Sequence, residues 1–138
     1  MKRVAKLLIQ DQSENFLLLY LNNHPAFGDS ADLPGGTVEE GESIQEGMVR
    51  EVLEETGIVC MDFTELYSGT EYSKHGTHKA LFLTKVQQHP RVTLSWEHSS
   101  YTWVPFETLV SEAKASKDDY MHMVAAVLTK QSSTKSKV

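Results

Sequence analysis

Seven glutamates and one arginine lie within residues 39–55, so this short segment carries a net charge of −6. The whole chain has 19 acidic and 13 basic residues, which leaves 12 of each outside the segment. The formal charge of the protein is therefore concentrated in these few residues. Like charges at close range repel one another unless a cation lies among them. Carboxylate oxygens are hard ligands, and Mg²⁺ or Mn²⁺ is the kind of cation that suits them.

A helix is predicted to bring these carboxylates together. Ser43-Ile44-Gln45-Glu46 is a capping-box pattern that begins a helix, and Gly57 is a typical residue to end it. Apolar residues recur between these ends with helical spacing: Ile44, Met48, Val49, Val52 and Leu53. Glu51, Glu54 and Glu55 stand at i, i+3 and i+4 and project from a neighbouring arc. Charged helix residues usually form a solvated face, but no lysine interrupts this segment. We therefore interpret the three glutamates as a divalent metal site.

The spacing of the fixed residues resembles the signature box of the Nudix hydrolases. Gly36 is followed after five residues by Glu42, and after seven more by Arg50-Glu51-Val52-x-Glu54-Glu55-x-Gly57-Ile58. The match covers 23 residues with nine fixed positions, which is a specific signal. The preceding Leu33-Pro34-Gly35-Gly36 also resembles the usual approach to the box. The resemblance implies an α+β protein with a Nudix-type α/β/α sandwich, in which helices flank a mixed β-sheet.

The same resemblance implies a role for individual residues. Glu51, Glu54 and Glu55 match the metal-binding and catalytic carboxylates of the family, with Mg²⁺ as the expected ion and Mn²⁺ as a substitute. Arg50 matches the arginine that pairs with these carboxylates and orients them. Gly35 matches a position whose backbone carbonyl ligates the metal.

Further matches lie at both ends of the sequence pattern. Gly36 begins the box, and Glu42 matches an outer carboxylate that supports the loop. Members of the MutT type carry a glutamate six residues before a tryptophan that opens the last strand, and Glu97 and Trp103 have this spacing. Glu97 is therefore the first candidate for the general base and a further metal ligand, with Glu54 as the alternative base.

The expected reaction follows from the chemistry of a pyrophosphate, whose anionic oxygens resist attack by a nucleophile. A divalent cation held by the glutamates would neutralise that charge and lower the pKa of a bound water molecule. We expect a magnesium-dependent pyrophosphohydrolase that cleaves a nucleoside triphosphate or another nucleoside diphosphate derivative. The alternatives are a diadenosine polyphosphate or dihydroneopterin triphosphate hydrolase, or a non-catalytic module that binds a nucleotide. A non-catalytic module would be expected to lose one of the three box carboxylates.

Substrate recognition is expected near a segment rich in Asn, Pro, Gly and Asp, residues 22–33, which is predicted to be a loop over the site. Tyr20, His24 and Phe27 lie in or beside this loop, where contacts to a base or sugar can form. His98, next to Glu97, is a candidate for a phosphate contact or a proton shuttle.

Length and composition predict one domain over residues 1–130 and a disordered tail over residues 131–138. Strands are expected at residues 4–9, 16–21, 58–67, 79–86 and 101–104, and further helices at residues 105–114 and 120–129. The single Cys60 excludes an internal disulfide. No apolar run reaches about 18 residues, and no basic cluster occurs, so neither a membrane span nor dedicated nucleic-acid binding is expected. The expectation is a cytoplasmic protein, either a monomer or a homodimer.

Overall fold

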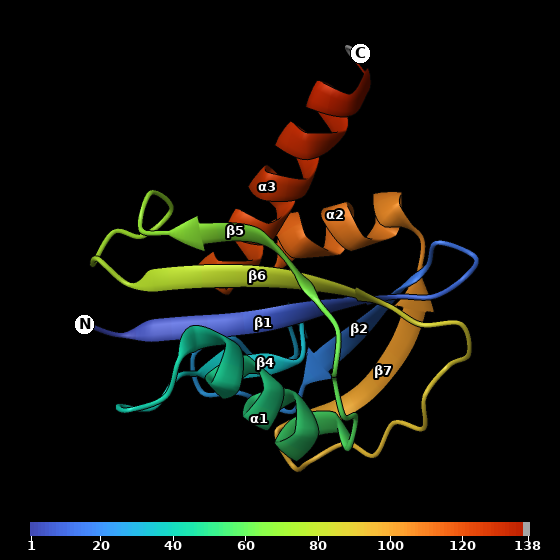
Figure 1. Cartoon of the computed structure of the whole chain (residues 1–138), viewed down its shortest axis with the longest axis horizontal. Helices are drawn as coiled ribbons and strands as arrows, with labels where there is room; N and C mark the ends of the chain where they lie inside the picture. The colour runs from blue at the N-terminus through green and yellow to red at the C-terminus, as the bar shows by residue number, and fades with distance from the viewer. Residues whose placement is uncertain (137–138) are drawn as a thin grey trace.

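A mixed sheet of seven strands lies at the centre of the molecule (Figure 1). The computed structural model describes residues 1–136. The strands are β1 (Arg3–Gln10), β2 (Phe16–Leu21), β3 (Ala31–Asp32), β4 (Gly35–Thr37), β5 (Thr64–Gly69), β6 (His78–Lys85) and β7 (His98–Val104). The main path of the sheet runs β3-β2-β1-β6-β5, while β4 pairs with β1 and β7 pairs with β2.

The centre of the sheet is the parallel pair of β1 and β6, whose register runs from Arg3 opposite His78 to Gln10 opposite Lys85. A parallel pair needs a covering layer on each face, and its strands are accordingly apolar. Successive side chains of a strand point to opposite faces. Leu7 and Leu8 are accordingly both fully buried but belong to different cores.

Helices cover both faces of the sheet, α1 (Ile44–Thr56) on one side and α2 (Phe106–Ala115) with α3 (Asp119–Ser136) on the other (Figure 1). Met48 and Val52 of α1 pack into one core, and Leu109 of α2 and Val124 of α3 pack into the second. The predicted α/β/α sandwich is confirmed. No helix among the described residues is long and apolar enough to cross a membrane.

The ends of α1 form as the capping pattern predicts. The Ser43 hydroxyl accepts a hydrogen bond from the Glu46 N–H at 3.0 Å, and the Glu46 carboxylate accepts one from the Ser43 N–H at 2.8 Å. Gly57 ends the helix in the left-handed conformation, with φ of 75°. The buried face differs from the prediction, because Leu53 is 46% exposed while Glu55 is buried. The inward face continues from Met48 and Val52 to Glu55, so a carboxylate takes the buried position that was expected for Leu53.

The larger differences from the sequence-based expectations lie in three strands and at the C-terminal end. The predicted loop over residues 22–33 contains the short strand β3, which pairs with β2, and β4 follows it. The strand expected at residues 58–67 begins only at Thr64, and β7 begins at His98 instead of Tyr101. Residues 131–136, predicted to be part of a disordered tail, continue α3. Residues 137–138 of that predicted tail lie outside the described residues.

The close approach of β4 to β1 requires a glycine at position 35. Gly35 has a φ of +134°, and an added Cβ would lie 2.5 Å from the Lys6 Cα and still closer to the Ala5 carbonyl oxygen. Both neighbours are backbone atoms, so neither can move aside as a flexible side chain would. β4 also carries Gly36, the first residue of the box. The close approach of β4 therefore places the start of the box beside β1.

We expect Gly35→Ala to lower the free energy of unfolding by about 4 kcal/mol, because backbone strain and a backbone clash act together. Gly41→Ala is the matched control, since Gly41 also has a positive φ, +88°, but no atom lies within 4 Å of its added Cβ. That control should cost about 1–2 kcal/mol. Urea denaturation monitored by circular dichroism measures both values. Equal losses for the two variants would contradict the close-approach explanation.

Candidate active site

Six carboxylates line one cavity of about 550 Å³, and three of them are predicted site residues: Glu51 and Glu55 from α1, and Glu97 from the turn before β7. The other three are Asp32, Asp118 and Asp119. The backbone of Gly35 and Gly36 forms part of the same wall. Residues more than 40 positions apart in the sequence therefore face a common space, as the resemblance implied for the box and Glu97. Glu54 differs from the other predicted carboxylates, because its side chain is 57% exposed and lies outside the cavity lining.

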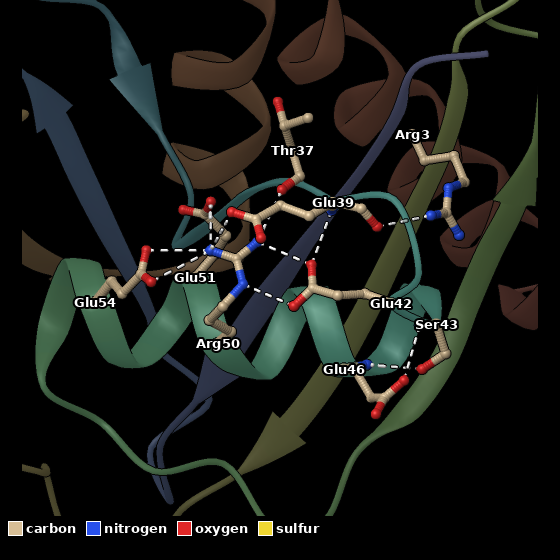
Figure 2. A network of polar contacts seen from close by, with 9 residues as sticks. All are labelled: Arg3, Thr37, Glu39, Glu42, Ser43, Glu46, Arg50, Glu51 and Glu54. Carbon is tan, nitrogen blue, oxygen red and sulfur yellow. Dashed lines mark hydrogen bonds and ion pairs between the residues drawn. The ribbon is translucent and has the colours of Figure 1, made fainter.

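Arg50 holds the outer carboxylates of this region (Figure 2). Its Nε lies 2.7 Å from Glu42 Oε2 and its Nη2 lies 2.9 Å from Glu42 Oε1, a two-point contact. Its Nη1 lies 3.1 Å from Glu51 Oε1 and 3.2 Å from Glu54 Oε2, and Nη2 also donates to the Thr37 carbonyl at 3.2 Å. The hydrogen bond from Arg50 is the main cause that lowers the pKa of Glu42 to about 2. The predicted pairing of Arg50 with the box carboxylates is thus present in the structure.

Glu51 contacts the Arg50 guanidinium and also reaches the cavity. An added Cβ at Gly36 would lie 2.8 Å from Glu51 Oε2, so this carboxylate rests directly on the glycine backbone. Burial raises the pKa of Glu51, and the nearby charges of Glu54 and Glu97 act in the same direction, while Arg50 opposes them.

Glu55 is the most deeply buried carboxylate of the box, with 4% of its surface exposed. Its Oε1 accepts a hydrogen bond from the Gly35 N–H at 3.3 Å. Burial raises the pKa of Glu55 to about 9, the charges of Asp32 and Glu97 act in the same direction, and Lys6 partly compensates. A group in this environment favours either a proton or a cation beside it.

Lys6, Asp32 and His98 form a buried polar network at the floor of the cavity. Lys6 Nζ lies 2.5 Å from Asp32 Oδ1, and His98 Nε2 lies 2.9 Å from Asp32 Oδ2. Burial alone would raise the pKa of Asp32, but Lys6 and His98 hold it at about 2. Sequence reasoning missed Lys6 and Asp32. The available signal was a lysine within the apolar run of β1, since an unpaired charge is rarely buried.

His98 and Tyr20 do not occupy the positions predicted for substrate contacts. The His98 side chain is 1% exposed and lies outside the cavity lining, because its ring is bound to Asp32. Tyr20 is partly buried against the core beneath α2 and α3 and also lies outside the lining. Both residues lie on paired strands of the sheet, His98 on β7 and Tyr20 on β2, and not on the loop that lines the cavity.

His24 and Phe27 do line the cavity, and their rings stack on each other with centroids 4.7 Å apart. His24 Nδ1 accepts hydrogen bonds from the N–H groups of Ala26 and Phe27, at 3.0 Å and 3.1 Å. A nitrogen that accepts two hydrogen bonds carries no proton, so the neutral ring has its proton on Nε2. The loop thus presents a fixed aromatic pair at the cavity.

The donor set of the cavity fits a divalent cation of the Mg²⁺ type. Its candidates are carboxylate and carbonyl oxygens, from Glu51, Glu55, Glu97 and Gly35, which are the ligands that such ions prefer. The raised pKa values of Glu51 and Glu55 mark a place where positive charge is favourable. Among the side chains that the structure describes, no three acidic, histidine or cysteine groups are gathered closely enough to hold an ion. In the structure, Arg50 balances part of the negative charge of these carboxylates through its contact with Glu51.

We expect the stability of the metal-free protein to fall with rising pH. The folded protein keeps a proton on Glu55 up to about pH 9, whereas the unfolded chain loses it near the ordinary value of 4.5. Between these limits the unfolded state binds fewer protons, so the free energy of unfolding decreases as pH rises. We expect a loss of about 1–2 kcal/mol between about pH 6 and pH 8 in EDTA.

Glu55→Gln should flatten this dependence and stabilise the metal-free protein at about pH 8. Glu54→Gln is the matched control, because its side chain is exposed and should leave the slope unchanged. Urea denaturation at a series of pH values measures all three proteins. An undiminished slope in Glu55→Gln would show that another group binds the proton.

Comparison with known proteins identifies relatives of this chain. A stretch of 51 residues is 45% identical to the ADP-ribose pyrophosphatase of Methanocaldococcus jannaschii and covers 37% of this chain and 30% of that protein. The chain spans about a third of the length of the curated relatives it matches.

Solved structures share the fold. The MutT protein from Methanosarcina mazei Go1 is 30% identical, with a TM-score of 0.65 over 79% of this chain and 80% of that one. The C. elegans Ap4A hydrolase is 23% identical, with a TM-score of 0.70 over the full length of both chains. The family model of the NUDIX domain matches residues 1–125, with the acidic helix, its arginine and the preceding glycines inside the match, and the chain therefore belongs to the NUDIX family.

Proposed function

We propose that this protein is a magnesium-dependent pyrophosphohydrolase that cleaves a nucleoside triphosphate or another nucleoside diphosphate derivative. The observation that carries the proposal is the convergence of Glu51, Glu55 and Glu97 on one cavity that also contains the backbone of Gly35 and Gly36. Relatives in the family generally use divalent metals, typically Mg²⁺. When bound, such an ion neutralises phosphate charge and makes water easier to deprotonate.

Glu51 and Glu55 are the residues proposed to hold the ion, together with the Gly35 carbonyl. Both side chains face the cavity, and in both the carboxyl pKa is raised in the absence of positive charge. Arg50 orients Glu51 and keeps Glu54 on the outer side of the helix. Glu42 in turn fixes the Arg50 guanidinium through two hydrogen bonds.

Glu97 is proposed as the general base that takes a proton from the attacking water. It lines the cavity from the turn before β7, a different element from the box helix α1. Glu54, the alternative base, is less suited, because two contacts with Arg50 hold it outside the cavity lining. The proton leaves the water for Glu97 while the oxygen attacks phosphorus in line with the departing phosphate oxygen.

The stacked pair of His24 and Phe27 is the proposed contact for the nucleoside part of the substrate. An aromatic face at the cavity can stack on any nucleotide base, which fits a small-molecule nucleotide. Lys2 and Lys74 also line the cavity. Their charge favours a substrate with several phosphates over one with a single diphosphate.

A non-catalytic nucleotide-binding module is the competing function. Retention of Glu51, Glu54 and Glu55 with Arg50 argues for catalysis, since binding alone does not need this set. The test is product release from a panel of nucleoside triphosphates, dinucleoside polyphosphates and ADP-ribose, with Mg²⁺, with Mn²⁺ and with EDTA. Tight binding without turnover of any of them would support the binding module.

We expect Glu97→Gln to lower kcat by about 10²- to 10⁴-fold with little change in KM, which is the usual contribution of general base catalysis. Raising the pH should partly restore the rate, because more hydroxide is then present. Glu40→Gln is the matched control, an exposed glutamate of the same acidic segment outside the cavity lining. Steady-state kinetics on the best substrate of the panel measures both variants. A rate near wild type in Glu97→Gln would shift the base to the box helix, with Glu54 the first alternative.

We also expect the melting temperature to depend on metal and nucleotide together. A ligand that binds only the folded state stabilises it by mass action. Mg²⁺ should raise the melting temperature, and Mg²⁺ with a non-hydrolysable nucleotide should raise it further. The nucleotide in EDTA should produce little shift, because its phosphates then face uncompensated carboxylates. A full shift in EDTA would show that basic residues, such as Lys2 and Lys74, are sufficient to bind the phosphates.

A further inference from the structure

The buried network of Lys6, Asp32 and His98 joins three strands of the sheet but has no role in the proposed reaction. Lys6 comes from β1, Asp32 from β3 and His98 from β7, and their side chains are 9%, 6% and 1% exposed. Removing three such groups from water is costly, and buried ion pairs are often no more stabilising than apolar residues of the same size. Stability alone therefore does not explain why these three polar residues are buried together.

The position of His98 in the chain suggests a function for the network. His98 is the first residue of β7 and directly follows Glu97. The backbone around Glu97 is held by hydrogen bonds: the Ser95 N–H donates to the Glu55 carbonyl at 3.1 Å, and the Asn22 N–H donates to the Glu97 carbonyl at 2.9 Å. The His98 N–H closes the turn on the Ser95 carbonyl at 3.4 Å. Two side chains also anchor this turn: Asn22 Nδ2 donates to the Trp96 carbonyl at 3.2 Å, and the His98 ring ties the end of the turn through Asp32 to β3 and β1.

We propose that His98 is a positioning residue that fixes the turn carrying Glu97 toward Glu51 and Glu55. This inference rests on the role of Glu97 in the proposed function. The His98 Nε2–H donates to one Asp32 carboxylate oxygen, and Lys6 binds the other. The His98 ring therefore cannot shift without breaking a buried contact. A base displaced by about 1 Å from its proton can lose about 10²-fold in rate. Glu51 and Glu55, proposed to hold the metal, and the aromatic pair proposed to contact the nucleoside are not part of this turn, so we expect binding to be largely spared.

The His98 ring also shows which substitution should preserve this function. Its Nδ1 is buried and has no partner among the described residues, so only the Nε2 donor is used. A glutamine amide can reach Asp32 in place of Nε2. An asparagine amide is one methylene shorter and cannot, although it is equally polar. Leucine removes the donor altogether.

The experiment compares kcat and KM of the full chain with His98→Leu, His98→Asn and His98→Gln. We expect His98→Leu and His98→Asn to lower kcat by about 10- to 100-fold and to leave KM within about threefold. His98→Gln should return kcat to within about threefold of wild type. His89→Leu is the matched control, because His89 Nε2 also contacts an aspartate, Asp11, at 2.6 Å, but lies outside the cavity lining. It should keep the wild-type rate.

A double-mutant cycle separates positioning from a general loss of structure. If His98 acts through Glu97, adding His98→Asn to Glu97→Gln should lower kcat by less than about threefold further, because the base is already absent. Circular dichroism and a thermal melt confirm that each variant is folded at the assay temperature. Should His98→Leu fail to fold, the asparagine and glutamine pair still carries the test.

The outcomes distinguish the two proposals. A wild-type protein without turnover of any nucleotide would overturn the proposed function before any variant is compared. An active wild type with an unimpaired Glu97→Gln would overturn the base assignment and this inference with it. An impaired Glu97→Gln with an unimpaired His98→Asn, a glutamine variant as slow as the asparagine variant, or multiplicative effects in the cycle would overturn the positioning role alone.

Discussion

The fork of contacts from Arg50 is the interaction on which the geometry of the acidic segment depends. Seven glutamates share this one positive side chain within residues 39–55, and its guanidinium contacts Glu42, Glu51 and Glu54 (Figure 2). A planar group with five donors can bridge carboxylates from a loop and from two turns of a helix, whereas an ammonium group cannot. Glu42 and Glu54 are therefore neutralised by the protein itself, whereas Glu51 also faces the cavity and is neutralised only in part.

That division has a consequence for the metal. Glu55 is buried, and the positive charge that acts on its pKa is that of Lys6. Since Lys6 is already bound to Asp32, it offsets only part of the charge. The two cores of the sandwich consist of apolar side chains, so we expect a bound cation to complete the cavity without being needed for folding. This differs from a structural metal site, where removal of the ion unfolds the domain.

The sequence predicted those features that rest on local rules. The helix over residues 44–56 follows from the capping box at Ser43 and the glycine at position 57, and the box spacing indicates which carboxylates meet. The separation of Glu54 from Glu55 was not predictable in the same way, because helical spacing places both on neighbouring arcs and tertiary packing buries only one. Strand β4 was missed for a similar reason. Its three residues have no hydrophobic pattern, and they become a strand only by pairing with β1.

Long-range pairing also explains why the carboxylates that meet at the cavity were easier to predict than the candidate substrate contacts. Glu51, Glu55 and Gly35 are held by the packing of α1 and β4 against β1, the most buried part of the sheet. His24 and Phe27 lie on a loop whose shape depends on hydrogen bonds within its own few residues. Loop residues of this kind can change without disturbing the carboxylates, so one reaction centre can serve different nucleotides. The turn of Glu97 is intermediate between the two, since Trp96 and Glu97 are exposed to solvent but His98 ties the turn to the buried floor. On the function proposed above, Glu97 and His98 belong with the fixed chemistry, and His24 and Phe27 with the part of the site proposed to select the substrate.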